Sequence, residues 1–487
     1  MDKTVQKTRA LRHAGNFIVA GPCNMPDDVV SKLQELLGEA AVLTGPALQQ
    51  REPVWQTNQP CHASAILLPS TTAEVSAILR ICNEAGQPVV PFGGVTNLVQ
   101  ACATTPEDVA LSLERLSEIE EIDTVAHTMT AQSGVTMRQA QEAADEAGLF
   151  FPVDIGARDS CMLGGNVATN AGGTKVIRYG MMRDSVLGLE AVLADGTVIA
   201  SMNRFIKNNS GFDLKHLFIG TEGALGIITK IVVRLSVKPK THSVGLVACN
   251  DFAQVVAVLN KAKEMLGATL CGFEVMWESF YRKATHPPGQ QASPFADSYP
   301  FYAIVESMGV SPGADDEAFE TVLESMLQDE LIVDAVIAKS DRERTAIWAI
   351  RNEVEWLVRD AFNYDVSLRS ADVGSYVEDV TQRIRSDLGD AFVTAFGHLG
   401  DNNIHVSVLA AGDKAAAKER VDGHIYEALL PYQGAISAEH GIGLDKRPYL
   451  PISRSADEIA LMKSLKRMLD PNNILNPGKV IDIQSSG

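Results

Sequence analysis

The sequence predicts an α/β or α+β protein of two large domains or three smaller ones. Its 487 residues amount to about three typical domains of ~150 residues, so a single small module is ruled out. Residues 65–92 follow the order of an apolar strand, a helix that opens at residues 70–72 and a second strand. This pattern halts at the Lys-Pro-Lys of residues 238–240, where we place the boundary between the domains.

The first domain is predicted over residues 51–238, after a lead-in segment of residues 1–50. Residues 27–40 carry apolar side chains at helical spacing and predict a short helix within that lead-in segment. Short apolar runs bounded by turn residues predict the remaining strands of the domain. These strands are expected at residues 108–112, 188–194 and 227–235.

The second domain is predicted over residues 239–487, where a new series of strands and helices begins. A loop rich in Pro, Gly and Ser at residues 286–298 predicts a surface excursion. The other predictions are a strand at 243–249, a helix at 251–266, a long helix around 341–362, two strands around 391–410, and helices at 413–430 and 455–469.

Charge and cysteine content limit the classes of partner and compartment. Lys and Arg number 42 and Asp and Glu number 61, and the net charge of −19 excludes bulk binding to nucleic acid or to an anionic membrane. No apolar run approaches the roughly 18–20 residues of a membrane span. We expect the basic residues 1–15 to be a solvated tail rather than a transit peptide. Seven scattered cysteines without a C-x-x-C pair predict reduced thiols and a cytoplasmic protein.

Three glycine-dense stretches mark the first domain, at residues 91–98 (PFGGVTNL), 154–173 and 218–229 (FIGTEGALGIIT). None has the G-x-G-x-x-G or G-x-x-x-x-G-K-[ST] pattern, so nicotinamide-binding Rossmann and P-loop sites are disfavoured. One such stretch alone is more often a turn, by roughly two to one. Three in one domain instead indicate backbone that approaches a ligand closely and offers N–H groups to phosphate oxygens.

The order of these stretches resembles the FAD-binding domain of the vanillyl-alcohol oxidase/p-cresol methylhydroxylase flavoproteins. The resemblance covers residues 52–236 and rests on PFGGVTN, on GGNVATNAGG with the following RYG, and on GTEGALGIIT. The first loop lacks the histidine through which some relatives link the cofactor, so the resemblance implies non-covalent FAD. The positions it assigns to FAD are Pro91, Gly93, Gly94, Thr96, Asn97, Leu98, Gly156, Ser160, Gly164, Gly165, Asn166, Thr169, Asn170, Gly172, Tyr179, Glu222, Gly226 and Ile227.

Three histidines gather between residues 398 and 440. The sequence around 391–410 predicts a hairpin whose turn, LGDNN, is flanked by His398 and His405. With the carboxylate of Glu439 these imidazoles would form an open three-ligand metal site, although a purely structural hairpin explains the two histidines equally well. Glu439 and His440 are adjacent and point opposite ways along an extended chain, so His440 is left as an unliganded base.

The segments GHLGDNNIH (397–405), SAEHGIG (437–443) and DPNNILNPGK (470–479) resemble the C-terminal domain of the FAD-dependent D-2-hydroxyacid dehydrogenases. The resemblance implies that the trio of His398, His405 and Glu439 holds a divalent zinc or manganese ion. It also implies that His440 is the catalytic base. The resemblance further implies that Arg351, on the predicted long helix, binds the substrate carboxylate. It also implies that Asn476 contacts the flavin.

The resemblances imply oxidation of a D-2-hydroxy acid to the 2-oxo acid by hydride transfer to flavin N5. Because the flavin accepts the electrons, hydrolytic metalloenzyme and iron-oxygenase interpretations leave the first domain unexplained. A flavin-carrying subunit of a multi-subunit glycolate oxidase complex stays open as the alternative, as does an oxidase that uses O₂. The expected partners are a small 2-hydroxy acid and an electron acceptor such as a quinone, an electron-transfer flavoprotein or a cytochrome. A homodimer is also compatible with the sequence.

The substrate is expected to be a D-lactate-like monocarboxylate or D-2-hydroxyglutarate. Enzymes specific for the dicarboxylate have Thr, Lys and Asn where this chain has Glu355, Asn363 and Ser407. These differences remove partners of a second carboxylate and favour a smaller or neutral side chain. The dicarboxylate ranks second, because cations elsewhere could compensate, and the candidates are Arg369, Lys446 and Arg447.

Overall fold

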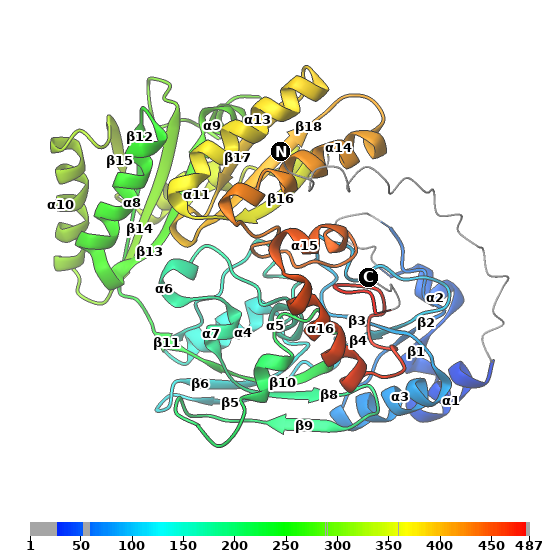
Figure 1. The fold of residues 1–487 in the computed structure, drawn as a ribbon. Coiled ribbons are helices and arrows are strands. Elements are labelled where there is room, and N and C mark those ends of the chain that lie inside the picture. The colour runs from blue at the N-terminus through cyan, green and yellow to red at the C-terminus, as the bar shows by residue number, and fades with distance from the viewer. Residues whose placement is uncertain (1–26, 52–58, 288, 290, 359, 484–487) are drawn as a thin grey trace.

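The computed structural model describes residues 27–51, 59–287, 289, 291–358 and 360–483. It confirms the predicted α+β architecture of two bodies, one above the other in Figure 1. The predicted N-terminal tail and Cys23 lie outside these residues. The six cysteines within them are free thiols. Within the same ranges, no helix has the length and apolar character needed to cross a membrane.

The first body holds a four-stranded sheet, a five-stranded sheet and a two-stranded pair. Their orders are β1 (Val42–Leu43), β2 (Ala65–Leu67), β4 (Val109–Ser112), β3 (Val89–Phe92); β5 (Ile119–Asp123), β6 (Thr128–Gln132), β10 (Ile227–Arg234), β8 (Val186–Val192), β9 (Val198–Ser201); and β11 (Ser236–Val237), β7 (Leu149–Phe150). Its helices are α1 (Asp27–Leu37), α2 (Gly45–Gln49), α3 (Thr72–Ala85), α4 (Met137–Glu146), α5 (Leu163–Thr169), α6 (Val176–Tyr179) and α7 (Met182–Ser185).

Local signals explain the helices that frame the first body. Helix α3 begins where the Thr71 hydroxyl accepts a hydrogen bond from the backbone N–H of Glu74, and it ends at Gly86 in the left-handed conformation. Helix α4 begins with a capping box between Thr136 and Gln139. The apolar faces of these helices pack on the sheets and leave the glycine-rich loops at the top of the body.

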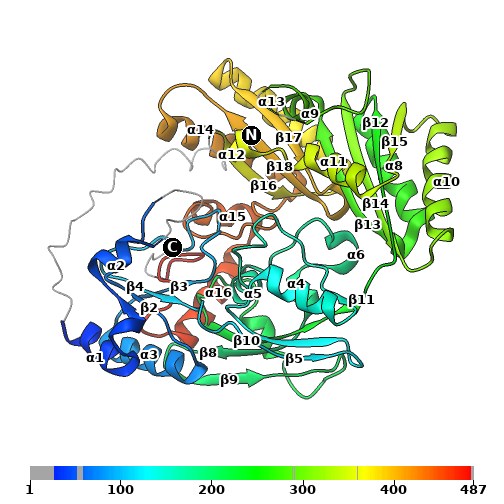
Figure 2. The same cartoon turned by 180° about the vertical axis from the view of Figure 1, so that it is seen from behind.

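The second body is one antiparallel seven-stranded sheet between two layers of helices (Figure 2). The strand order is β15 (Asp334–Ile337), β12 (Thr241–Cys249), β14 (Phe301–Gly309), β13 (Leu270–Trp277), β17 (Phe392–Gly397), β18 (Asn403–Leu409), β16 (Phe362–Ser367). One face carries α8 (Phe252–Leu266), α10 (Ala314–Gln328), α13 (Val373–Leu388) and α14 (Lys414–Glu427). The other face carries α9 (Glu278–Thr285), α11 (Asp341–Asn352) and α12 (Glu355–Val358).

The long helix predicted around residues 341–362 is wrong. Helix α11 ends at Asn352, the short α12 follows, and the chain then becomes strand β16 at Phe362. Residues 362–367 pair in register with residues 403–408 of β18. The backbone already leaves the helical conformation at Glu353, with ψ near 70°, and the strand begins where the predicted helix was expected to end.

The chain returns to the first body at its end. Helices α15 (Leu450–Ser453) and α16 (Ala456–Leu469) lead back, and α16, in red, lies along the first body in Figure 1. The side chains of Ile474 and Leu475 are fully buried in the core of the four-stranded sheet, where Leu475 forms a parallel bridge with Val89. Asn476 is thereby carried to the junction between the two bodies.

Candidate active site

A cleft of about 1450 Å³ lies between the two bodies. Its lower wall comes from the three glycine-rich stretches, and its upper wall comes from residues 351–358 and the histidine cluster. Pockets for a drug-sized ligand typically measure roughly 300–1,000 Å³. The cleft therefore has room for a dinucleotide-sized cofactor beside a small substrate.

The glycines of the lower wall serve two purposes. A Cβ at Gly94 would lie 1.9 Å from the carbonyl oxygen of Ser160, and a Cβ at Gly164 would lie 2.5 Å from Cβ of Ser133. Gly94 lets the first two stretches pack against each other, and Gly164 lets the second stretch pack against the segment that follows β6. A Cβ at Gly156 or Gly165 would meet no atom within 4 Å. Because both residues line the cleft, they leave bare backbone facing a ligand.

Three buried polar atoms of the cleft have no hydrogen-bond partner within the described residues. They are Asn97 Nδ2, Ser133 Oγ and Asn476 Oδ1. Buried polar atoms are rarely left unpaired, because each one costs roughly 1–3 kcal/mol. A polar cofactor in the cleft would satisfy them, so the residues present fit FAD.

Seventeen of the predicted flavin positions, Asn476 included, line the cleft, and two do not. Asn170 ends helix α5 in the left-handed conformation, and its side-chain oxygen accepts a hydrogen bond from the N–H of Arg183. The ring of Tyr179 packs against Phe150. The residues that line the cleft are Pro91, Gly93, Gly94, Thr96, Asn97, Leu98, Gly156, Ser160, Gly164, Gly165, Asn166, Thr169, Gly172, Glu222, Gly226, Ile227 and Asn476.

Glu222 has a structural contact besides lining the cleft. Its carboxylate accepts hydrogen bonds from the backbone N–H groups of Ile442, at 2.6 Å, and Gly443, at 3.0 Å. Its backbone oxygen accepts one from the side chain of Asn476. Glu222 thus fastens the loop that follows His440 to the first body.

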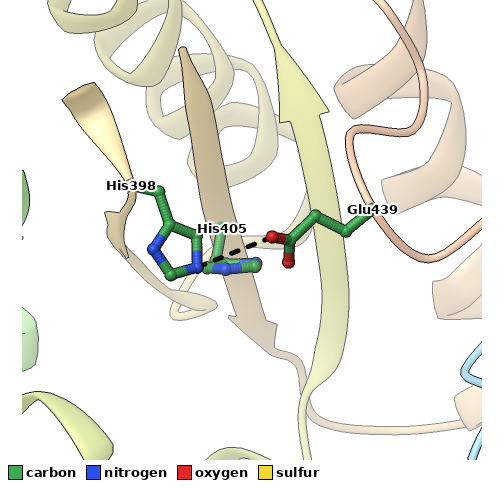
Figure 3. A group of neighbouring side chains, drawn as sticks. All are labelled: His398, His405 and Glu439. Carbon is green, nitrogen blue, oxygen red and sulfur yellow. Dashed lines mark ion pairs between the residues drawn. The ribbon is translucent and has the colours of Figure 1, made fainter. Parts of the chain in front are cut away.

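The predicted metal trio is assembled at the upper wall (Figure 3). His398 follows β17, His405 lies in β18, and the two strands form the predicted hairpin. One ligand atom from each of His398, His405 and Glu439 lies within 4.8 Å of the others. His398 Nε2 is 3.9 Å from Glu439 Oε1, along the dashed line of Figure 3. Nitrogen and oxygen donors at this spacing suit a divalent zinc or manganese ion.

The pKa values of the two histidines shift in opposite directions. Burial alone would lower the pKa of His398, but the charges of Glu274 and Glu439 raise it above its ordinary value. Burial lowers the pKa of His405 well below its ordinary value, and the charges of His398 and Arg351 lower it further. The imidazole of His405 is therefore neutral, as metal binding requires. Glu439 Oε1 accepts a hydrogen bond of 2.9 Å from the N–H of Gly173, so the first body orients a ligand of the second.

His440 is held by Asp365, a residue that the sequence analysis named no role for. Nδ1 of His440 is 2.9 Å from Asp365 Oδ1, and the side chain of Asp365 is fully buried in β16. The other carboxylate oxygen accepts the backbone N–H groups of residues 438–440 at 2.8–3.0 Å. Burial alone would raise the pKa of Asp365, but the charges of His440 and Lys446 hold it well below its ordinary value.

Arg351 and His398 share a second buried carboxylate, Glu274, which the sequence analysis also missed. Glu274 lies on β13 with no exposed surface. Burial alone would raise its pKa, but the charges of His398 and Arg351 hold the pKa well below its ordinary value. A lone acid inside an apolar strand is the signal that could have found both carboxylates, since buried acids are nearly always paired.

The structure also places the residues at which the chain departs from the dicarboxylate pattern. Glu355 lines the cleft beside Arg351. Asn363 accepts a hydrogen bond from Ser407 at 2.7 Å, and neither residue lines the cleft. The three proposed compensating cations bind elsewhere: Arg369 to Asp372, Lys446 to Asp365, and Arg447 to the carbonyl of Gly478.

Comparison with known proteins agrees with this geometry. Residues 63–201 match the FAD binding domain family, and residues 238–480 match the family of FAD linked oxidases, C-terminal domain. The chain is 36% identical to D-2-hydroxyglutarate dehydrogenase of Xanthomonas citri pv. viticola, over 94% of this chain and 98% of that protein. It is 35% identical to mitochondrial D-2-hydroxyglutarate dehydrogenase of Bos taurus, over 93% of this chain and 84% of that protein.

Solved structures show the same fold. The structure of p-cresol methylhydroxylase with substrate bound superposes with a TM-score of 0.75 at 18% identity, over 94% of this chain and 98% of that chain. The glycine wall, the unpaired polar atoms of the cleft and the two family matches lead to one conclusion. The chain belongs to the FAD-linked oxidases, shares the fold of p-cresol methylhydroxylase, and is an FAD-dependent oxidoreductase.

Proposed function

We propose that the protein oxidises the C2 hydroxyl of a D-2-hydroxy acid to a 2-oxo acid, using FAD and a divalent cation. The observation that carries the proposal is the convergence of three kinds of group at one end of the cleft. These are the guanidinium of Arg351, the Asp365-bound imidazole of His440, and the trio of His398, His405 and Glu439. The names of the relatives support the D configuration and the 2-hydroxy acid class.

Each cofactor has a set of residues that would hold it. Backbone at Gly156 and Gly165 and the unpaired polar atoms of Asn97, Ser133 and Asn476 would hold FAD. Bound FAD supplies the acceptor for the C2 hydrogen and its two electrons. His398, His405 and Glu439 would hold the cation, which would supply Lewis-acid polarisation of the substrate hydroxyl.

The chain's own residues bind the acid and move the hydroxyl proton. The planar guanidinium of Arg351 suits two parallel hydrogen bonds to the substrate carboxylate. His440 Nε2 accepts the hydroxyl proton, because its Nδ1 already faces Asp365. Asp365 keeps the ring oriented and stabilises the imidazolium that forms. The hydroxyl proton thus leaves to His440, and C2 becomes the carbonyl carbon.

We further propose that the preferred substrate carries one carboxylate. The only Lys or Arg side chains among the described residues that line the cleft are Arg158 and Arg351, and Arg158 pairs with Asp154 at 3.5 Å. Glu355 places an acid beside Arg351. A second carboxylate would meet this acid without a dedicated cation, so a D-lactate-like acid ranks above D-2-hydroxyglutarate.

Anaerobic mixing of the FAD-loaded protein with a panel of D- and L-2-hydroxy acids tests the proposal. We expect D acids to bleach the flavin absorbance and L acids to leave it unchanged. A flavin that stays oxidised with every acid would contradict the proposal and favour a subunit that needs partner chains. Adding a quinone, an electron-transfer flavoprotein or a cytochrome after bleaching then identifies the acceptor by flavin reoxidation.

A further inference from the structure

We infer that Glu274 is a positioning residue that fixes the tautomer of His398 and, with the same carboxylate, the orientation of Arg351. The inference rests on the proposed metal site and extends it, because it names what prepares His398 to be a ligand. Among the described residues, Glu274 forms no hydrogen bond with the other two proposed metal ligands, His405 and Glu439.

The geometry of Glu274 divides its two oxygens between two partners. Oε1 lies 2.5 Å from Nδ1 of His398, and Oε2 accepts a hydrogen bond of 2.7 Å from Nε of Arg351. The three residues come from positions far apart in the chain, with Glu274 and His398 separated by 124 residues. The fold therefore builds this triangle, and all three side chains are buried in it.

An ionised carboxylate can only accept hydrogen bonds. Its contact with Nδ1 of His398 therefore requires a proton on Nδ1. In the neutral ring this leaves the lone pair on Nε2, and Nη2 of Arg351, which can only donate, lies 3.2 Å from that atom. Nε2 is the atom that faces Glu439. A carboxylate that binds the far nitrogen of a metal-ligating histidine fixes its tautomer and raises its basicity, and losing such a partner costs roughly 10–100-fold in metal affinity.

The same carboxylate determines which part of Arg351 remains for substrate. Because Nε donates to Glu274, the substrate carboxylate would bind to the terminal nitrogens of the guanidinium. One of them, Nη2, lies 3.2 Å from Nε2 of His398. The substrate anchor and the metal ligand are therefore neighbours, which would place the substrate carboxylate beside the cation.

Glu306 on the adjacent strand β14 provides a matched control. It is 1% exposed and also binds one histidine and one cation, with His242 Nε2 at 2.6 Å and Lys175 as the ion-pair partner. It accepts one further hydrogen bond, of 3.2 Å, from Nε1 of Trp348. His242 is not among the residues that could hold a metal ion. A Glu306→Gln variant therefore loses the same kind of buried charge without touching His398.

The test measures Zn²⁺ binding to the FAD-loaded, metal-depleted protein by titration calorimetry. In Glu274→Gln the amide has one acceptor oxygen, and Arg351 claims it because its Nε can only donate. The amide NH₂ then faces Nδ1 of His398 and favours the tautomer with its proton on Nε2, which blocks ligation. We expect Zn²⁺ affinity about 10–100-fold lower in Glu274→Gln and within about two-fold of wild type in Glu306→Gln, with FAD stoichiometry unchanged in both.

A Glu274→Asp variant tests the same claim if the Gln variant fails to fold. Its shorter carboxylate cannot reach both partners at their present distances, so we expect Zn²⁺ affinity at least several-fold below wild type. Wild-type affinity in either folded variant, or an equal loss in Glu306→Gln, would overturn the inference while leaving the proposed reaction standing. A wild-type protein that binds no Zn²⁺ would contradict the proposed metal site and the inference together.

Discussion

The two walls of the cleft differ in what they offer a ligand. The lower wall offers backbone, bare at Gly156 and Gly165, and a few amide and hydroxyl groups. The upper wall offers charged and titratable side chains, three of which are oriented by a buried carboxylate: Arg351 and His398 by Glu274, and His440 by Asp365. The protein has a net charge of −19, so neither wall attracts anions through an excess of cations. We therefore expect added atoms on the lower wall to weaken FAD binding. On the upper wall we expect the removal of single groups to slow the reaction.

Removing the metal ion should have the largest effect on the upper wall. Chelation is expected to lower turnover by about 10³-fold or more, because the polarisation of the substrate hydroxyl is lost. FAD should stay bound, since its predicted contacts lie on the lower wall. Metal analysis, flavin absorbance and turnover on one chelated sample check this together. Unchanged turnover after verified metal loss would count against the trio of His398, His405 and Glu439.

His440→Ala should slow flavin reduction by about 10²-fold or more, because the proton acceptor is lost. FAD and Zn²⁺ contents should match those of wild type, since His440 belongs to neither predicted set. Stopped-flow reduction by a D-2-hydroxy acid is the measurement. A wild-type reduction rate in this variant would refute the assignment of His440 as the base.

Gly165→Ala should weaken FAD binding by about ten-fold, because its methyl group would enter the cleft where no atom lies within 4 Å. The stability of the metal-free apoprotein should not fall, since Gly165 lies in helix α5 and Ala is the better helix former. FAD titration and thermal unfolding measure the two effects. An unchanged FAD affinity would argue against bare backbone as the cofactor contact.

Gly94→Ala is the matched variant on the same wall. Its methyl group would lie 1.9 Å from the carbonyl oxygen of Ser160, so the two stretches must move apart. We expect a lower melting temperature of the apoprotein in this variant and not in Gly165→Ala. Equal melting temperatures would contradict the distinction between Gly94, which permits packing, and Gly165, which permits contact with the ligand.

Glu355→Gln should have the smallest effect. Removing one exposed charge is worth up to about 1 kcal/mol, or about five-fold. We expect kcat/KM for D-2-hydroxyglutarate to rise by this factor relative to D-lactate. Asn363→Lys is the control, because Asn363 lies outside the cleft and should leave the ratio unchanged. A larger shift in the control than in Glu355→Gln would show that the second carboxylate binds elsewhere.

Local signals account for what could be predicted from the sequence. The hairpin of β17 and β18 follows from two apolar runs and a turn, and it places His398 beside His405 without further information. The glycine-rich stretches likewise predict segments whose backbone approaches a ligand closely. The same local reasoning failed at residues 353–362, where the chain leaves helix α11, forms the short α12 and then enters strand β16.

The partners of the two carboxylates that orient the site could not be predicted from the sequence, because they lie far away along the chain. Glu274 meets Arg351 across 77 positions, and Asp365 meets the backbone of residue 440 across 75. Neither spacing follows from a helix or a hairpin. Only the seven-stranded sheet, with β13 and β16 on either side of the hairpin, brings these acids to the histidines.

The central claim is that the two walls act on one C2–H bond of a D-2-hydroxy acid. The most direct test is the anaerobic rate of flavin reduction by saturating D-lactate with either hydrogen or deuterium at C2. We predict reduction that is several-fold slower with deuterium, because breaking this bond reduces the flavin. Equal rates with both isotopes, or no reduction at all, would contradict the account.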